Sequence, residues 1–166
     1  MTYLIGLPLL ALAAVVQATV LARFTIFGGM LDLVLLLTLS WTLVGEWQGG
    51  VMWGLMGGLT LDTLSGGPFG ATAVGLITVA YLAGLTEGGF WRSHVLLPLA
   101  SALLGSILFH LITLVLLAVT GYPVDWAYSL TQLTLPAVLL DTLCMLPVYG
   151  LVRGLHAFAH PAPVSI

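Results

Sequence analysis

The sequence contains no lysine, and only 5% of its 166 residues are charged. Three arginines and six acidic residues cannot cover a water-facing surface, because a soluble domain carries about a quarter of its residues as charged side chains. Instead, 60% of the residues are hydrophobic and the mean hydropathy is +1.18. The surrounding solvent must therefore be largely lipid, and the composition predicts an integral membrane protein in contact with the lipid bilayer.

Other absences narrow the class of function. The net charge of −3 and the lack of a basic patch argue against nucleic acid as a partner. A phosphate-binding P-loop needs a lysine, so that motif is excluded. Cys144 is the single cysteine, which precludes an internal disulfide. We expect no metal site and no cofactor. His156 and His160 are expected to lie in a solvated polar tail at the C-terminal end of the sequence.

Six apolar segments are separated by polar and glycine-rich breaks such as EWQGG. They cover residues 3–22, 31–45, 51–64, 68–85, 95–119 and 131–152. Helices satisfy their own backbone hydrogen bonds within lipid, so each segment is expected to be helical. Segments 31–45 and 51–64 are shorter than the roughly 20 residues that cross a hydrocarbon core. We predict a single all-α domain over residues 1–166, a compact bundle of about six transmembrane helices.

The orientation of such a bundle follows from its few arginines. An even number of spans places both termini on the same side of the membrane. Arg92 and Arg153 fall on that side and Arg23 falls on the other. Because cytoplasmic connections carry the excess of positive charge, both termini are predicted to be cytoplasmic.

The stretch GLMGGLTLDTLSGGPFGATAVG places Asp62 among seven glycines. Gly54 and Gly58 lie four residues apart on one helical face, which lets another helix approach closely in lipid. The Ser-Gly-Gly-Pro break predicts a tight helical hairpin whose second helix begins at Pro68 and is kept narrow by Gly70.

Asp62 lies beside this break and has two interpretations. Its carboxylate can accept hydrogen bonds from the first amides of the second helix, which would make it a structural cap. Alternatively it is an ion or proton site, because intramembrane acids often mark transport pathways. No cation lies nearby in the sequence, so we favour the cap.

Asp141 lies near the middle of the last segment, where a bare charge costs a few kcal/mol. We expect it to be protonated or hydrogen-bonded to a neighbouring helix, with His110 as a candidate partner. A structural bond of this kind is favoured over proton transfer. Ser106 and His110 share one helix face, but such pairs are usually packing residues, so we expect no catalytic residue and no enzyme.

Two further faces carry small residues at helical spacing. Ala14, Ala18 and Ala22 form a ridge on the first segment, and Ser101 and Gly105 form a pair on the fifth. Helices in lipid associate through such faces, either within one bundle or with a partner helix. The sequence leaves both possibilities open.

The hairpin region extended to GLMGGLTLDTLSGGPFGATAVGLITVAYLAG resembles the signature region of the MreD family of rod shape-determining proteins. That family shows a glycine-spaced helix, an Asp-x-Leu-Ser-Gly-like break, then Pro-x-Gly and a second helix ending near Tyr-Leu-x-Gly. The matching positions are Gly54, Gly58, Asp62, Ser65, Gly66, Pro68, Gly70, Tyr81, Leu82 and Gly84.

The resemblance extends to the flanking segments. LDLVLLLTLSW is similar to the family's Pro-Asp-Leu run, with Asp32 matching and Leu31 in place of proline. LPAVLLDTLCMLPVYGL looks like the family's last span, although Asp141 stands where asparagine is expected. The positions that fit there are Pro136, Pro147 and Tyr149.

The resemblance implies a non-enzymatic scaffold or regulator of the bacterial cell-elongation complex, which synthesises peptidoglycan and maintains rod shape. It implies a multi-pass protein of the cytoplasmic membrane. The implied partners are the single-span protein MreC, and RodA with its class B penicillin-binding protein, bound directly or through MreC.

The alternative is the substrate-binding membrane subunit of an energy-coupling-factor vitamin transporter. That subunit is also a six-helix bundle of similar size, and the present bundle could resemble its fold. Its first helix docks the energising module through alanines four apart, a pattern that Ala14, Ala18 and Ala22 fit. Such a subunit needs a roomy polar pocket and sizeable outer loops, whereas the outer connections here are short, which favours the scaffold.

Overall fold

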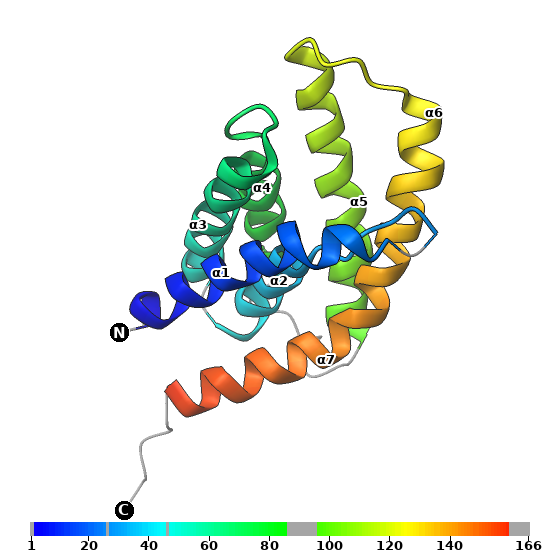
Figure 1. Ribbon diagram of the computed structural model, residues 1–166. Coiled ribbons are helices and arrows are strands. Elements are labelled where there is room, and N and C mark those ends of the chain that lie inside the picture. The colour runs from blue at the N-terminus through cyan, green and yellow to red at the C-terminus, as the bar shows by residue number, and fades with distance from the viewer. Residues whose placement is uncertain (1, 26, 46, 86–95, 160–166) are drawn as a thin grey trace, which may run out of the picture.

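The computed structural model describes residues 2–25, 27–45, 47–85 and 96–159 (Figure 1). Every regular element in these ranges is helical, which confirms the all-α prediction. Arg92, Val95 and His160, used in the predictions above, lie outside the described residues. The elements in chain order are α1 (Thr2–Thr19), η1 (Leu21–Arg23), α2 (Leu33–Val44), α3 (Trp47–Ser65), α4 (Ala71–Gly84), α5 (Leu96–Val119), α6 (Trp126–Tyr128), η3 (Ser129–Thr134) and α7 (Leu135–Ala159).

Helix α2 is the centre of the packing. All ten residues from Val34 to Leu43 are buried, and α2 contacts α1, α3, α4, α5 and α7. Its polar side chains bond in different ways. The Thr42 hydroxyl donates to the Thr38 carbonyl within the helix at 2.8 Å, and the Ser40 hydroxyl donates to the sulfur of Met145 in α7 at 3.8 Å. The shortness of the predicted segment 31–45 therefore reflects a helix surrounded by protein.

Helix α3 begins at Trp47, four residues before the predicted start at Val51. The sequence suggested a break at Gly49 and Gly50, but both lie inside α3 and are buried. A Cβ atom on Gly50 would overlap the Thr42 side chain of α2. These glycines therefore permit close packing of α3 on α2 instead of ending a helix.

Helices α6, η3 and α7 form one continuous helical rod that is longer at both ends than the predicted segment 131–152. The Asp125 carboxylate caps its start by accepting a hydrogen bond from the Tyr128 amide at 3.1 Å. A wider π-helical turn follows at Ser129–Thr134. The rod changes direction within α7 (Figure 1), which contains Pro147, a residue that disrupts the preceding helical turn.

Two helices in the described part of the chain are long and apolar enough to cross a membrane. They are Leu96–Val119, with a mean hydropathy of 2.5, and Trp126–Phe158, with 1.8. Only 22% and 28% of an 18-residue apolar window in each helix are buried, so most of these residues are half-buried or exposed. Leu104 and Val119 of α5, for example, are 66% and 77% exposed. In Figure 1 the two helices run side by side, while α1 crosses the bundle at a steep angle to α5.

Candidate functional site

The Asp62 carboxylate closes the hairpin between α3 and α4. It accepts backbone hydrogen bonds from Gly70 at 3.0 Å, Thr72 at 3.0 Å and Ala73 at 3.2 Å, and only 4% of Asp62 is exposed. These amides lie at the start of α4, where they have no partner within the helix and carry the positive end of its dipole. The structure shows the bonds that the capping interpretation predicts.

The connection between the two helices depends on glycine conformation. Gly66 and Gly70 have φ angles of +66° and +96°, and a Cβ atom added to either would meet no other atom within 4 Å. Gly70 therefore provides a left-handed turn and not the narrow packing face expected of it. Ser65 ends α3 and its hydroxyl accepts from the Gly67 amide at 3.4 Å. Pro68 precedes α4 instead of starting it, because the helix begins at Ala71.

The glycine face of α3 is closed within this chain. A Cβ atom on Gly58 would overlap the backbone of Ala73, and one on Gly54 would lie 3.1 Å from the backbone of Leu76. The two helix backbones are therefore in direct contact along this face. Gly54 and Gly58 serve the internal packing of α3 on α4 and are not available to a partner.

A second buried cluster contains Asp32, from the run that precedes α2, and Asp141, from α7. The backbone amide of Asp32, at the start of α2, donates to Oδ1 of Asp141 in α7 at 2.9 Å. The Ser106 hydroxyl of α5 donates to Oδ2 of Asp141 at 2.6 Å. Asp141 is 0% exposed, so both of its oxygens are satisfied inside the protein.

His110 contacts Asp32 instead of the predicted partner Asp141. Its Nε2 lies 3.2 Å from Oδ2 of Asp32, and its Nδ1 lies 2.8 Å from the Ser106 carbonyl oxygen. Because that carbonyl can only accept, Nδ1 carries a hydrogen. The Ser106 hydroxyl bonds to Asp141, so Ser106 and His110 do not form a nucleophile and its base.

Gln17 of α1 completes the cluster. Its amide nitrogen donates to Oδ1 of Asp32 at 2.9 Å, and its oxygen accepts from the Val34 amide at 2.9 Å. Gln17 was not among the residues predicted from the sequence, although an amide side chain inside an apolar helix needs a partner. The cluster therefore links α1, α2, α5 and α7 through side chains that are far apart in the sequence.

A cavity of about 370 Å³ opens beside this cluster. It lies between the end of α1, the connection to α2, the α3–α4 hairpin and α5. Its wall includes the polar side chains of Gln17, Asp32, Ser65 and Thr72. The apolar residues that line it are Ala18, Ala22, Met30, Leu61, Leu64 and Phe109.

The predicted alanine ridge, which covers Ala14 and Ala18 of α1 and Ala22 of η1, does not form one outward face. Ala14 is 0% exposed and belongs to the core, whereas Ala18 and Ala22 line the cavity. The three alanines therefore do not form the continuous ridge that the sequence predicted.

Pro136 and His156 of α7 both have packing roles. A Cβ atom on Gly29 would overlap Pro136, so this proline fits closely against the connection before α2. His156 is half-buried, and its ring meets the edge of Trp41 with centroids 5.4 Å apart. The prediction of a solvated tail is wrong for His156, because α7 continues past it and packs its ring on α2.

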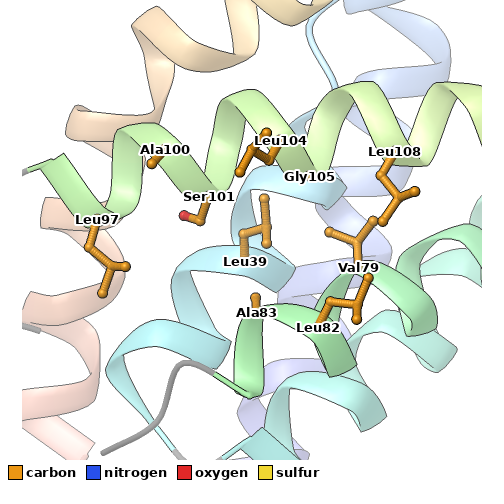
Figure 2. Close-up of a pocket in the computed structure, with 10 residues that line it drawn as sticks. All are labelled: Leu39, Val79, Leu82, Ala83, Leu97, Ala100, Ser101, Leu104, Gly105 and Leu108. Atoms are coloured by element: carbon orange, nitrogen blue, oxygen red, sulfur yellow. The ribbon is translucent and has the colours of Figure 1, made fainter. Parts of the chain in front are cut away.

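An apolar groove of about 280 Å³ lies between α4 and α5, with α2 beneath it. Figure 2 shows Ser101 and Gly105 on its α5 side, facing Leu39, Val79 and Ala83. The Ser101 hydroxyl donates to the Pro98 carbonyl at 2.8 Å, so it presents no free polar group. The remaining lining residues are Leu82, Leu97, Ala100, Leu104 and Leu108.

Within the described ranges, no group of three or more His, Cys, Asp or Glu side chains could hold a metal ion. Comparison with curated proteins and with solved structures gives no match. Comparison with protein families matches residues 1–158 to the rod shape-determining protein MreD, a range that includes the hairpin, Asp32 and Asp141. The chain therefore belongs to the MreD family of bacterial membrane proteins, and its role lies in the determination of rod shape.

Proposed function

We propose that this protein is a non-enzymatic, six-span scaffold of the cell-elongation complex in the cytoplasmic membrane, with both termini in the cytoplasm. It binds the single membrane helix of MreC, and engages RodA and its class B penicillin-binding protein directly or through MreC. Family membership supports the role in cell shape. The short connections that the structure describes leave the helices themselves as the main surface for partners.

The groove between α4 and α5 is the observation that carries this proposal. The hydrophobic effect does not drive helices together within lipid. They associate by close packing instead, at faces where small residues let the two backbones approach. The groove has small residues on both sides, with Ala83 on α4 and Ala100 and Ser101 on α5 (Figure 2). Gly105 is buried, and a Cβ atom there would lie 3.0 Å from Leu39 and Val79, so it serves the packing of α5 on α2 and α4. The glycine face of α3 is already occupied by α4. We therefore propose that the MreC helix docks in the α4–α5 groove.

Affinity purification of the full chain in mild detergent tests the function. The expected result is co-purification of MreC, RodA and the penicillin-binding protein, identified by mass spectrometry. Recovery of an ATPase module in their place would overturn the scaffold and support the vitamin-transporter alternative.

A substitution that fills the groove tests the docking surface. Ala100 is exposed on the groove wall, so Ala100→Phe should obstruct a partner helix without displacing a core residue. Imperfect packing costs about 1–3 kcal/mol, and we expect MreC recovery to fall at least about fivefold. Val115→Phe is the matched control, because Val115 is 48% exposed on α5 but does not line the groove. Equal recovery from both variants would show that MreC binds elsewhere.

A further inference from the structure

The outward face of α7 changes character at Pro147. Ahead of this proline, exposed leucines follow one face of the helix at a spacing of three or four residues. They are Leu135, Leu139, Leu143 and Leu146, which are 59%, 63%, 74% and 39% exposed. In the same helical register the face continues as Gly150, Arg153 and Ala157, all exposed. The large apolar side chains that suit lipid therefore end on this face just before Pro147, and small and charged residues replace them.

The length of the rod agrees with an end to the membrane crossing at this point. From Trp126 to Leu146 it runs for about 20 residues, or roughly 30 Å, which is the thickness of the hydrocarbon core. Trp126 and Tyr128 are 44% and 56% exposed at its start, as is typical of aromatic residues at the membrane–water interface. The full 33 residues from Trp126 to Phe158 reach about 50 Å, which exceeds a single crossing.

The part of α7 after Pro147, residues 148–158, is called the C-terminal arm here. The rod turns away from α5 within α7, so the arm does not continue the direction of the crossing (Figure 1). One face of the arm packs on the bundle, because Val152 is 0% exposed and the His156 ring meets Trp41 of α2. The arm is therefore held against the end of the bundle.

The exposed residues of this region divide into two groups on either side of that packed face. One group is a stripe of large apolar side chains at the helical spacing of i, i+4 and i+7. The stripe consists of Leu151, Leu155 and Phe158, which are 58%, 41% and 89% exposed. The other group has no large apolar side chain and contains Gly150, Arg153, Gly154 and Ala157. A helix with an apolar flank and an arginine on the opposite flank is typical of one that lies in a membrane surface.

We propose that the C-terminal arm lies in the plane of the membrane at its interface with water. The stripe inserts between the phospholipid headgroups and the acyl chains, and Arg153 is directed toward the aqueous side. The apolar surface is continuous along the chain with the leucine face of the crossing, which favours lipid as its occupant. A docked helix is disfavoured, because helices in lipid associate through small residues and the stripe has none. No residue of the stripe lines the cavity at Asp32 or the α4–α5 groove.

The depth of single spin labels tests this position. The full chain with Cys144 replaced by serine is reconstituted in nanodiscs of phosphatidylethanolamine and phosphatidylglycerol. Electron paramagnetic resonance then compares the accessibility of each label to oxygen, which concentrates in lipid, and to a water-soluble nickel complex. Labels at Leu155→Cys and Phe158→Cys should lie within about 5–10 Å of the headgroup boundary. Their oxygen-to-nickel ratios should fall below that of Leu139→Cys in the crossing.

The matched controls are Arg153→Cys and Ala157→Cys, which place the label on the opposite flank of the same arm. Their ratios should be the lowest of the set. Ratios at Leu155 and Phe158 as low as these would show that water or protein covers the stripe, and would overturn the proposal. Ratios as high as that of Leu139→Cys would overturn it too, because the arm would then cross the hydrocarbon core.

A charge placed in the stripe provides a second test. With the label kept at Phe158, Leu155→Asp should draw the arm toward water and raise access of the nickel complex. Ala157→Asp adds the same charge on the aqueous flank and should leave that access unchanged. Both positions are exposed, so neither change disturbs the core. Equal access in the two variants would contradict insertion of the stripe into lipid.

Discussion

Two acidic side chains of this protein illustrate what the sequence can and cannot predict at the scale of the residue. The Asp62 cap could be predicted because its donors lie 8 to 11 residues along the chain, within one hairpin. The bond between Asp32 and Asp141 joins residues 109 positions apart, and it depends on how α2 and α7 pack. The same holds for His110, which was expected to contact Asp141 and contacts Asp32.

Replacement of Asp62 by alanine should destabilise the protein strongly. The change leaves three buried or half-buried amides at the start of α4 without their acceptor. A buried donor left without an acceptor costs about 1–3 kcal/mol. Asp125→Ala is the matched control, because Asp125 caps a helix through one exposed bond and its loss costs about 1 kcal/mol. Thermal unfolding in detergent should show the larger drop for Asp62→Ala. A larger drop for Asp125→Ala would contradict the capping role.

At the scale of the element, local signals located the helices but not their ends. The apolar runs and the Ser-Gly-Gly-Pro break placed the six main segments near the observed helices. The observed helix ends differ from the predicted ones where a glycine has a role in packing or turning that the sequence alone does not show. Gly50 continues α3 because it fits against Thr42, whereas Gly70 turns the chain because its φ is +96°.

The close contact between α3 and α4 gives a prediction at this scale. Gly58→Ala places a methyl group against the backbone of Ala73, so the two helices must separate. We expect this overpacking to lower the free energy of unfolding by about 1–3 kcal/mol. Gly150→Ala makes the same change in α7, where no atom lies within 4 Å of the new group. That control should be neutral or raise stability, because alanine favours a helix over glycine by about 1 kcal/mol. Measurement of the Tm of both variants tests this prediction. Equal Tm values would show that α3 and α4 are not in close contact at Gly58.

For the whole molecule, composition alone predicted the membrane environment, because a chain with 5% charged residues cannot present a water-facing surface. The arrangement of the bundle could not be predicted in this way. The central position of α2 and the cavity beside Asp32 depend on contacts between helices distant in sequence. The groove at Ser101 lies between consecutive helices, but its floor is Leu39 of α2. Apolar periodicity carries no information about which helices are neighbours.

The proposed topology can be tested by cysteine labelling in intact cells. With Cys144 replaced by serine, single cysteines at Phe69 and Tyr122 should react with a membrane-impermeant maleimide from outside. Both positions are exposed and lie in the connections after α3 and after α5. A cysteine at Ser93, in the connection between α4 and α5, should react only after the membrane is permeabilised. The reverse pattern would show that both termini are outside.

The burial of α2 also bears on how the chain enters the membrane during synthesis. Twelve residues reach about 18 Å at 1.5 Å per residue, well short of the roughly 30 Å of hydrocarbon. A helix this short is not expected to be stable across the bilayer by itself. We therefore expect α2 to be retained only once its neighbours are present, so that biogenesis proceeds by cooperative insertion of several helices and not one helix at a time.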